Sequence, residues 1–148
     1  MLTEEQQRQK RARFRDHWQD GVGFNKACGV HVRRWEADGV EIELPYRDDL
    51  SAHDGIFHGG VVSALIDTAG CGAVAAGHDY DKGSRITTIA LSVQYFTVAP
   101  GEDIVAFARC TRRGRRVNYA DVVVRSATSG KDLAQGLVTV SVSGERQV

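Results

Sequence analysis

A single carboxylate lies in the middle of the longest apolar stretch of the chain. Asp67 is the only charged side chain between His58 and His78. A buried carboxylate without a partner is costly, so this position needs a reason. One explanation is a general base or nucleophile in a dry pocket. The alternative is a structural carboxylate that is hydrogen-bonded to a core threonine or a backbone amide, or that faces a water-filled crevice.

The same stretch opens with a histidine and two glycines, His58–Gly59–Gly60. At a helix N-terminus the free N–H groups point outward, and the helix dipole favours negative charge. Because glycine has no side chain, such a turn can bind a phosphate or polarise a carbonyl group as an oxyanion hole. A tight turn without any ligand is the structural alternative.

Small residues share the helix face of Asp67. The neighbours on this face are Gly60, Ser63, Ala64, Gly70 and Cys71. Gly70 and Gly72 each cost about 1 kcal/mol relative to alanine in a helix, which indicates that another chain or a ligand approaches closely. Cys71 is interpreted as a small buried hydrophobe rather than as a reactive thiol.

The elements around this stretch are predicted from periodicity. Thr3–Trp18 predicts a first helix with a capping box at its start, and Gly21 or Gly23 ends it. This helix either docks through its two aromatic residues or forms a loosely held arm. The apolar residues 59–77 predict a second, buried helix, and a loop over residues 46–58 precedes it.

Alternation of apolar and polar residues predicts strands with one wet face. Little room remains for crossover helices between the later strands, so these are expected to be antiparallel and joined by hairpins. The predicted strands are Val30–Arg33, Val40–Leu44, Arg85–Val98, Ile104–Arg112, Val117–Thr128 and Leu133–Ser143.

The order of these elements predicts the fold class. A helix that is apolar all round must be covered all round, and six antiparallel strands are enough to curl about it. We therefore expect an α+β fold with a curved sheet wrapped around a long central helix, plus an extra N-terminal helix. The predicted division is an N-terminal helix and linker over residues 1–24 and one domain over residues 25–148.

The composition excludes several classes of protein. A chain of 148 residues, 42% of them hydrophobic, has room for one domain. Nineteen basic residues balance nineteen acidic ones, which argues against a nucleic-acid binder. The polar start of the chain predicts no secretory signal, and the central Asp67 argues against a membrane span. Three cysteines without a CxxC pair predict a reducing, cytoplasmic location.

The pattern HGGxxxxxxD, from His58 to Asp67, resembles that of the hotdog-fold acyl-CoA thioesterases, specifically the PaaI-like group of the phenylacetate pathway. The resemblance covers roughly residues 25–143. It implies a hotdog thioesterase domain that hydrolyses an acyl- or aryl-CoA to the free acid and coenzyme A. Further matching segments are Gly101–Ile104, Arg112–Arg116, Gly130–Lys131 and Ala134–Gly136.

The resemblance also implies roles for individual residues. The N–H of Gly59 polarises the thioester carbonyl, and Asp67 acts as base or nucleophile. His58 helps to position the thioester. Thr88, with Thr87 as a near alternative, orients the attacking water.

Two further residues are expected to contact the substrate, Gly60 and His53. The chain departs from the family pattern six residues before His58, where the family usually has Asn or Gln. Ala52 occupies that position, so His53 or Ser51 is the candidate replacement.

One subunit is not expected to form the site alone. Gly59 and Asp67 are eight residues apart, which is about 12 Å along a helix. A nucleophile and its target must come within about 3–3.5 Å of each other. An antiparallel partner helix would bring a second Asp67 to the first Gly59, so we predict a homodimer with two composite sites. The resemblance implies the same, often with dimers paired into tetramers.

Coenzyme A carries phosphates, so cations are expected near the site. The candidates are four arginines around one glycine, where a merely solvated turn is the alternative. No metal is expected, because the pair His53 and His58 lacks a metal motif. No cofactor is expected beyond the coenzyme A of the substrate. The four arginines are Arg112, Arg113, Arg115 and Arg116.

Two other functions remain open. A hotdog hydratase or dehydratase would also act on acyl thioesters, but it typically arranges its histidine and its acid differently. A non-catalytic acyl-CoA-binding module would keep the pocket without needing Asp67.

Overall fold

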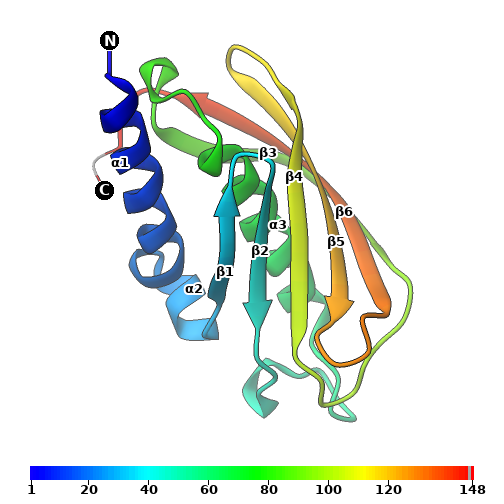
Figure 1. Cartoon of the computed structure of the whole chain (residues 1–148). Helices are drawn as coiled ribbons and strands as arrows, with labels where there is room; N and C mark the ends of the chain where they lie inside the picture. The colour runs from blue at the N-terminus through cyan, green and yellow to red at the C-terminus, as the bar shows by residue number, and fades with distance from the viewer. Residues whose placement is uncertain (147) are drawn as a thin grey trace.

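A long helix, α3 (Gly59–Ala76), occupies the centre of the fold. In the computed structural model, which describes residues 1–146 and residue 148, a six-stranded antiparallel sheet curves around this helix (Figure 1). The predicted α+β architecture is therefore confirmed. The strands are β1 (His31–Glu36), β2 (Gly39–Leu44), β3 (Arg85–Tyr95), β4 (Ile104–Arg113), β5 (Val117–Ser126) and β6 (Asp132–Ser143).

The strand order, β1-β2-β4-β5-β6-β3, corrects one part of the prediction. The last three strands form consecutive hairpins as expected, but β3 and β4 do not pair with each other. β3 pairs with β6 at one edge, whereas β4 pairs with β2. The connection between β3 and β4 passes the loop before α3, where the Gly101 N–H donates to the Gly55 carbonyl at 2.7 Å.

β3 also ends earlier than the predicted Arg85–Val98. Beyond Tyr95, the N–H groups of Phe96 and Thr97 both donate to the single carbonyl of Leu133, at 2.8 and 3.2 Å. Two donors on one acceptor break the alternating ladder, so the chain turns away from the sheet. The apolar and polar residues of the sequence continue to alternate beyond Tyr95. The alternation therefore could not predict this turn.

The N-terminal segment contains more than the single predicted helix, and it docks firmly on the rest of the fold. α1 (Glu4–Asp16) begins with the predicted capping box, continues into a π-helical turn, η1 (His17–Gly21), and is followed by α2 (Gly23–Cys28). Phe14 is only 1% exposed, which excludes a loosely held arm. α2 spans the predicted boundary between residues 24 and 25.

The two glycines Gly70 and Gly136 let α3 lie close to β6. A Cβ atom built at Gly70 would lie 2.5 Å from Val138, and one at Gly136 would lie 2.5 Å from Ile66. A Cβ atom at Gly72 would lie 3.1 Å from Trp35 and 3.3 Å from Trp18, which is a tight but milder contact. The expectation that another chain or a ligand approaches Gly70 and Gly72 is therefore wrong, because side chains of the same chain cover both.

α3 is covered along only part of its length. Nearly all residues from Leu65 to Ala76 are buried, whereas Gly59 and Gly60 are exposed and residues 61–64 are half-buried. The helix is long and apolar enough to cross a membrane, but more than half of it is buried inside the fold. The expectation of a helix covered all round is wrong for its first turns, which remain open to a ligand or a second chain.

The close approach of α3 to β6 leads to a stability prediction. The Gly136→Ala substitution should destabilise the protein by about 1–3 kcal/mol, because the added methyl meets a branched Ile66 side chain that is fully buried. The measurement is the free energy of unfolding in urea. Gly23→Ala is the control, because a Cβ there meets nothing within 4 Å; its effect should stay within about 0.5 kcal/mol. Equal stability of Gly136→Ala and the wild type would contradict the required approach.

Candidate functional site

Asp67 forms a hydrogen-bonded pair with Thr88 across the helix–sheet interface. The Thr88 hydroxyl, on β3, donates to Asp67 Oδ1 at 2.6 Å, and the Cys71 thiol lies 3.8 Å from the same oxygen. Asp67 is half-buried, so it is neither fully buried nor without a partner. The threonine contact is the one expected of a structural carboxylate, while the remaining exposure leaves the carboxylate accessible to a ligand.

A β-bulge in β3 aims Thr88 at α3. The ladder with β6 pairs Thr88 with Val140 and then Ala90 with Thr139, so Ile89 is the extra residue. Without the bulge, Thr88 and Tyr95 would lie on opposite faces of β3, because they are seven residues apart. With it, both contact α3. Thr87, the near alternative to Thr88, points to the other face and is exposed.

Asp67 faces a hollow of about 360 Å³, here called the Asp67 hollow. Its outer wall is formed by the N-terminal segment. The Trp18 indole N–H donates to the Thr68 carbonyl at 2.9 Å, the Thr68 hydroxyl donates to Asn25 at 3.1 Å, and Asn25 donates to the Trp18 carbonyl at 2.8 Å. This closed set of bonds joins η1 and α2 to α3 directly beside the carboxylate.

Gly59 offers a free N–H at the start of α3. The Gly60 N–H donates to His58 Nδ1 at 2.9 Å, and the N–H groups of Val61 and Val62 donate to the His58 carbonyl. Within the described part of the chain, no acceptor faces the Gly59 N–H. The Gly60 N–H is therefore already bonded, and the His58 side chain caps the helix. The expected contact of Gly60 with the substrate stays a prediction.

Gly59 borders a second hollow, of about 400 Å³, here called the Gly59 hollow. Ala52 and His53, from the loop before α3, lie at its rim and are exposed. Its opposite wall is the connection after β3. Ala52 presents only a methyl group there, so the usual amide of the family pattern has no counterpart at this position.

Tyr95 is a site residue that the sequence analysis missed. Its hydroxyl donates to the Gly59 carbonyl at 2.7 Å and also contacts the Ser63 hydroxyl. It thereby anchors the end of β3 to the first turn of α3. Only the position of the bulge could have revealed this contact, since strict alternation places Tyr95 on the face away from Thr88.

One chain does not bring Gly59 and Asp67 together. The two residues border different hollows, and no lining residue is common to both. Their separation of eight residues on one regular helix corresponds to about 12 Å. A site that uses both groups on one substrate therefore needs a second copy of α3.

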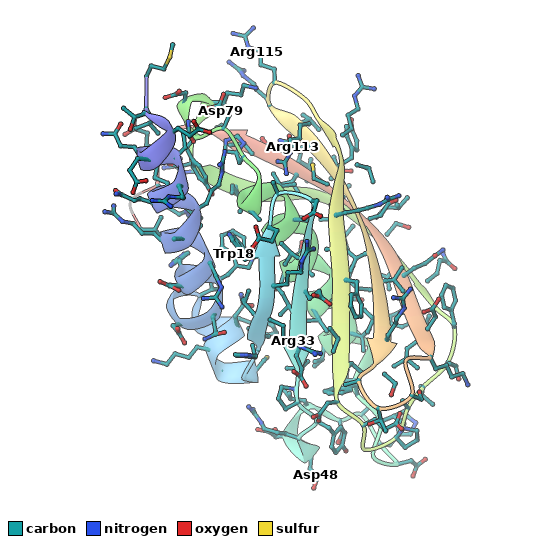
Figure 2. All side chains as sticks on the ribbon, in the orientation of Figure 1. Trp18, Arg33, Asp48, Asp79, Arg113 and Arg115 are labelled. Atoms are coloured by element: carbon teal, nitrogen blue, oxygen red, sulfur yellow. The ribbon has the colours of Figure 1, made fainter. Side chains whose placement is uncertain are left out.

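The four arginines of the β4–β5 hairpin do not act as one group. The Arg113 guanidinium donates to the carbonyls of Val74 and Ala73 at 2.9 and 3.1 Å, so it caps the end of α3. Arg113 is itself exposed, and its contact with a phosphate stays a prediction. Arg112, Arg115 and Arg116 are exposed. Figure 2 shows Arg113 and Arg115 at the end of the molecule opposite Asp48, which precedes α3.

A metal centre has no support in the described residues, because no three His, Cys, Asp or Glu side chains there are close enough to share an ion. Burial, together with the adjacent Asp67 and despite the Thr88 hydrogen bond, raises the pKa of the Cys71 thiol to about 12. A protonated thiol is a poor nucleophile. Cys71 therefore packs beside the pair without supplying a thiolate.

The fold and this site place the chain in a known class. The thioesterase superfamily model matches residues 54–132, more than half of the chain. The chain therefore belongs to the thioesterase superfamily, and its architecture is the hotdog fold.

Individual relatives agree with this assignment. A candidate esterase of Halobacterium salinarum is 33% identical over 108 residues, 71% of each chain. The medium/long-chain acyl-CoA thioesterase YigI of Escherichia coli is 27% identical over 67% of this chain and 72% of its own. The mouse acyl-coenzyme A thioesterase 13 is 29% identical over 55% and 57%.

Solved structures support the fold. The zebrafish thioesterase superfamily member 2 superimposes with a TM-score of 0.75 at 24% identity, over 97% of this chain and all of its own. A thioesterase-superfamily-related protein of Shewanella oneidensis gives a TM-score of 0.81 at 22% identity, over 93% and 97%.

The pKa of Cys71 leads to a labelling prediction. In the native protein at pH 8, iodoacetamide should leave Cys71 almost unmodified, because the thiol is protonated and buried. In urea the pKa returns to about 8.5 and the same residue should be labelled. Peptide mass spectrometry measures both states. Rapid labelling of native Cys71 at pH 8 would show that the thiol is ionised and accessible.

Proposed function

We propose that this protein hydrolyses acyl-CoA thioesters as a homodimer with two composite sites. In each site, Gly59 of one protomer and Asp67 of the other act on the same thioester. The observation that carries the proposal is the free Gly59 N–H and the Asp67–Thr88 pair, which border separate hollows on one helix. Membership of the thioesterase superfamily and the relatives that are named acyl-CoA thioesterases support the substrate class.

The exposed edge of the sheet supports the dimer. β3 pairs on one side only and has eleven residues, a long edge for a protein that remains monomeric. Large apolar side chains on and just beyond β3 are 40–56% exposed. Antiparallel pairing of two β3 strands about a two-fold axis would cover them and set the α3 helices side by side in opposite directions. These side chains are Ile89, Leu91, Tyr95, Phe96 and Val98.

The geometry supports the following chemistry. The Gly59 N–H holds the thioester oxygen and stabilises the negative charge that develops on it. Thr88 occupies Asp67 Oδ1 as a donor, which leaves Oδ2 to take a proton from water. The water oxygen bonds to the carbonyl carbon, the carbon–sulfur bond breaks, and the coenzyme A thiolate receives the proton from Asp67. In the nucleophilic variant, Asp67 itself displaces the thiolate, and water then cleaves the mixed anhydride.

A non-catalytic acyl-CoA-binding module is the second candidate. Ala52 favours it, because the amide that the family pattern has at this position is missing from the rim of the Gly59 hollow. Retention of the Asp67–Thr88 pair favours catalysis instead, since mere binding does not need a carboxylate beside the thioester.

Replacement of the carboxylate separates these two functions. Asp67→Asn keeps the shape and can still accept the Thr88 hydrogen bond, but it cannot take a proton. Thiol release from a panel of acyl-CoA esters should fall by about 10²–10⁴-fold in kcat. Thr87→Ala is the control, because Thr87 is exposed on the other face of β3, and its kcat should change little. Equal release by wild type and Asp67→Asn would remove Asp67 from the mechanism, whereas binding without turnover would favour the module.

The oxyanion donor can be removed without removing the helix. Proline is tolerated at the first helical position, where Gly59 lies, and Gly59→Pro eliminates the N–H. The expected loss in kcat is about 10²–10³-fold. Gly59→Ala keeps the N–H, and its Cβ would meet Tyr95 at an ordinary 3.6 Å, so it should retain activity. If Gly59→Pro and Gly59→Ala lower kcat by similar factors, the cause is the added side-chain volume rather than the missing N–H.

Mixing the two inactive variants tests the composite site. A heterodimer of Gly59→Pro and Asp67→Asn chains contains one site in which both groups are intact. Random pairing should therefore restore about a quarter of the wild-type activity. Co-expression with two affinity tags isolates the heterodimer. Absence of activity in this species, at the dimer mass in light scattering, would place both groups in the same chain.

A further inference from the structure

The two hollows differ in polarity. The Gly59 hollow ends on buried aliphatic side chains, Ile104, Val124 and Leu133, and Phe96 and Val98 cover it. His53 is the one histidine among its lining residues. The other polar side chains that line it are the hydroxyls of Tyr95 and Thr97, and Tyr95 already donates to the Gly59 carbonyl.

The Asp67 hollow is more polar than the Gly59 hollow, and Arg146 brings a positive charge to its rim. His17 and Arg146 line it, and burial together with the Arg146 charge lowers the pKa of His17, so the ring is neutral at pH 7. Asn25 and Thr68 add polar groups to the same wall. The polar side chains of this hollow can therefore hydrogen-bond amides, and its charged rim suits a charged group. The aliphatic Gly59 hollow offers neither.

A large polar groove continues from the Asp67 hollow. The two share Phe14 and Arg146, and the groove, of about 920 Å³, runs between the start of α1 and the end of the chain. Lys10, Arg13 and Arg146 line it, and in the described part of the chain none of them forms a salt bridge with a side chain. Its acidic lining residues are Asp81, which accepts from the Leu2 N–H and the Gln7 amide, and Glu145.

We propose that acyl-CoA binds across the dimer in one orientation, with its acyl group in the Gly59 hollow of one protomer and its coenzyme A half leaving past Asp67 of the other toward the polar groove. The proposal rests on the composite site of the proposed function. The acyl carbon and the sulfur leave the thioester carbonyl on different sides, so each half of the substrate must enter a different hollow. The apolar half matches the aliphatic hollow, and the pantetheine amides and phosphates match the more polar one.

The size of the Gly59 hollow limits the acyl group. A volume of about 400 Å³ lies near the lower end of the roughly 300–1,000 Å³ range of ligand pockets. This suits a medium-length alkyl or an aryl group. Each methylene that the hollow buries should improve binding about fourfold, and chains longer than the hollow should gain nothing more.

Two phenylalanines provide a matched test of the acyl subsite. Phe96, on the Gly59 hollow, and Phe24, on the Asp67 hollow, are 52% and 55% exposed, so neither truncation removes a core side chain. With acyl-CoA esters of increasing length and one aryl ester, Phe96→Ala should shift the optimum in kcat/KM to longer groups and change the long-to-short ratio by about tenfold. Phe24→Ala should leave that ratio within about twofold. Ala52→Leu, which fills the rim, should shift the optimum to shorter groups.

The reversed pattern, in which Phe24 controls acyl length and Phe96 does not, would overturn the orientation, and so would an unchanged ratio in both variants. Because Phe96 lies beside the β3 edge, sedimentation must show the same oligomeric state as the wild type. A weakened dimer would lower the overall activity without changing the long-to-short ratio of kcat/KM. The ratio is therefore the readout.

The coenzyme half is tested by charge reversal. Arg13→Glu should raise the KM for acyl-CoA several-fold and leave the KM for the matching acyl-pantetheine thioester unchanged, because only coenzyme A carries the nucleotide phosphates. Arg109→Glu, at an exposed position on β4, is the control and should change neither KM. Arg115→Glu, on the β4–β5 hairpin where the sequence predicted phosphate contacts, tests that competing assignment and should also change neither. If Arg115→Glu raises the KM for acyl-CoA and Arg13→Glu does not, the hairpin binds the phosphates. The proposed path of the coenzyme A half is then overturned.

Binding measurements keep this proposal separate from hydrolysis. Dissociation constants of alkyl-CoA thioethers, which cannot be hydrolysed, should depend on chain length through Phe96 and not through Phe24. If the wild type binds these thioethers in that manner but hydrolyses no thioester, the proposed function fails and the orientation stands. If it hydrolyses thioesters but Phe24 controls the length dependence, the orientation fails and the function stands. Failure to bind any thioether would overturn the orientation directly.

Discussion

The close contact between α3 and β6 determines how the rest of the molecule is arranged. Gly70 on the helix and Gly136 on the strand bring the two backbones near enough for Val138 and Ile66 to fill the space of missing side chains. This contact buries the C-terminal part of the helix and leaves its first turns uncovered. The carboxylate of Asp67 lies where the covered part begins, so it is half-buried, held by the Thr88 hydroxyl and still accessible.

A single irregularity in β3 then connects the helix to the edge of the sheet at two points. The bulge at Ile89 places both Thr88 and Tyr95 toward α3, one beside Asp67 and the other beside Gly59. Bulges occur often beside active sites because one extra residue changes which side chains face inward. Here the bulge lets β3 hold α3 at two points, Asp67 and Gly59. The outer edge of β3 is unpaired. Pairing at that edge would therefore be coupled directly to the geometry of the site.

The N-terminal segment belongs to the site rather than to the periphery. η1 and α2 are tied to α3 through Trp18, Thr68 and Asn25, and they form the outer wall of the Asp67 hollow. This wall lies outside residues 54–132, the part that matches the superfamily model. Relatives can therefore share the helix and its glycine turn while differing in the surface beside the carboxylate.

Local chemistry determined much of this protein from the sequence alone. Alternation predicted the strands, and the apolar run with one acid predicted the central helix, because periodicity and helix-end chemistry act over a few residues. HGG with a following aspartate indicated the class through its resemblance to a known family. Tertiary structure decided what depends on distant partners. It paired β3 with β6, covered Gly70 and Gly72 from within the chain, committed Arg113 to the end of α3, and brought Tyr95 to Gly59 through a bulge that strict alternation cannot reveal. These outcomes are contacts between segments far apart in the chain, and no local pattern of residues encodes them.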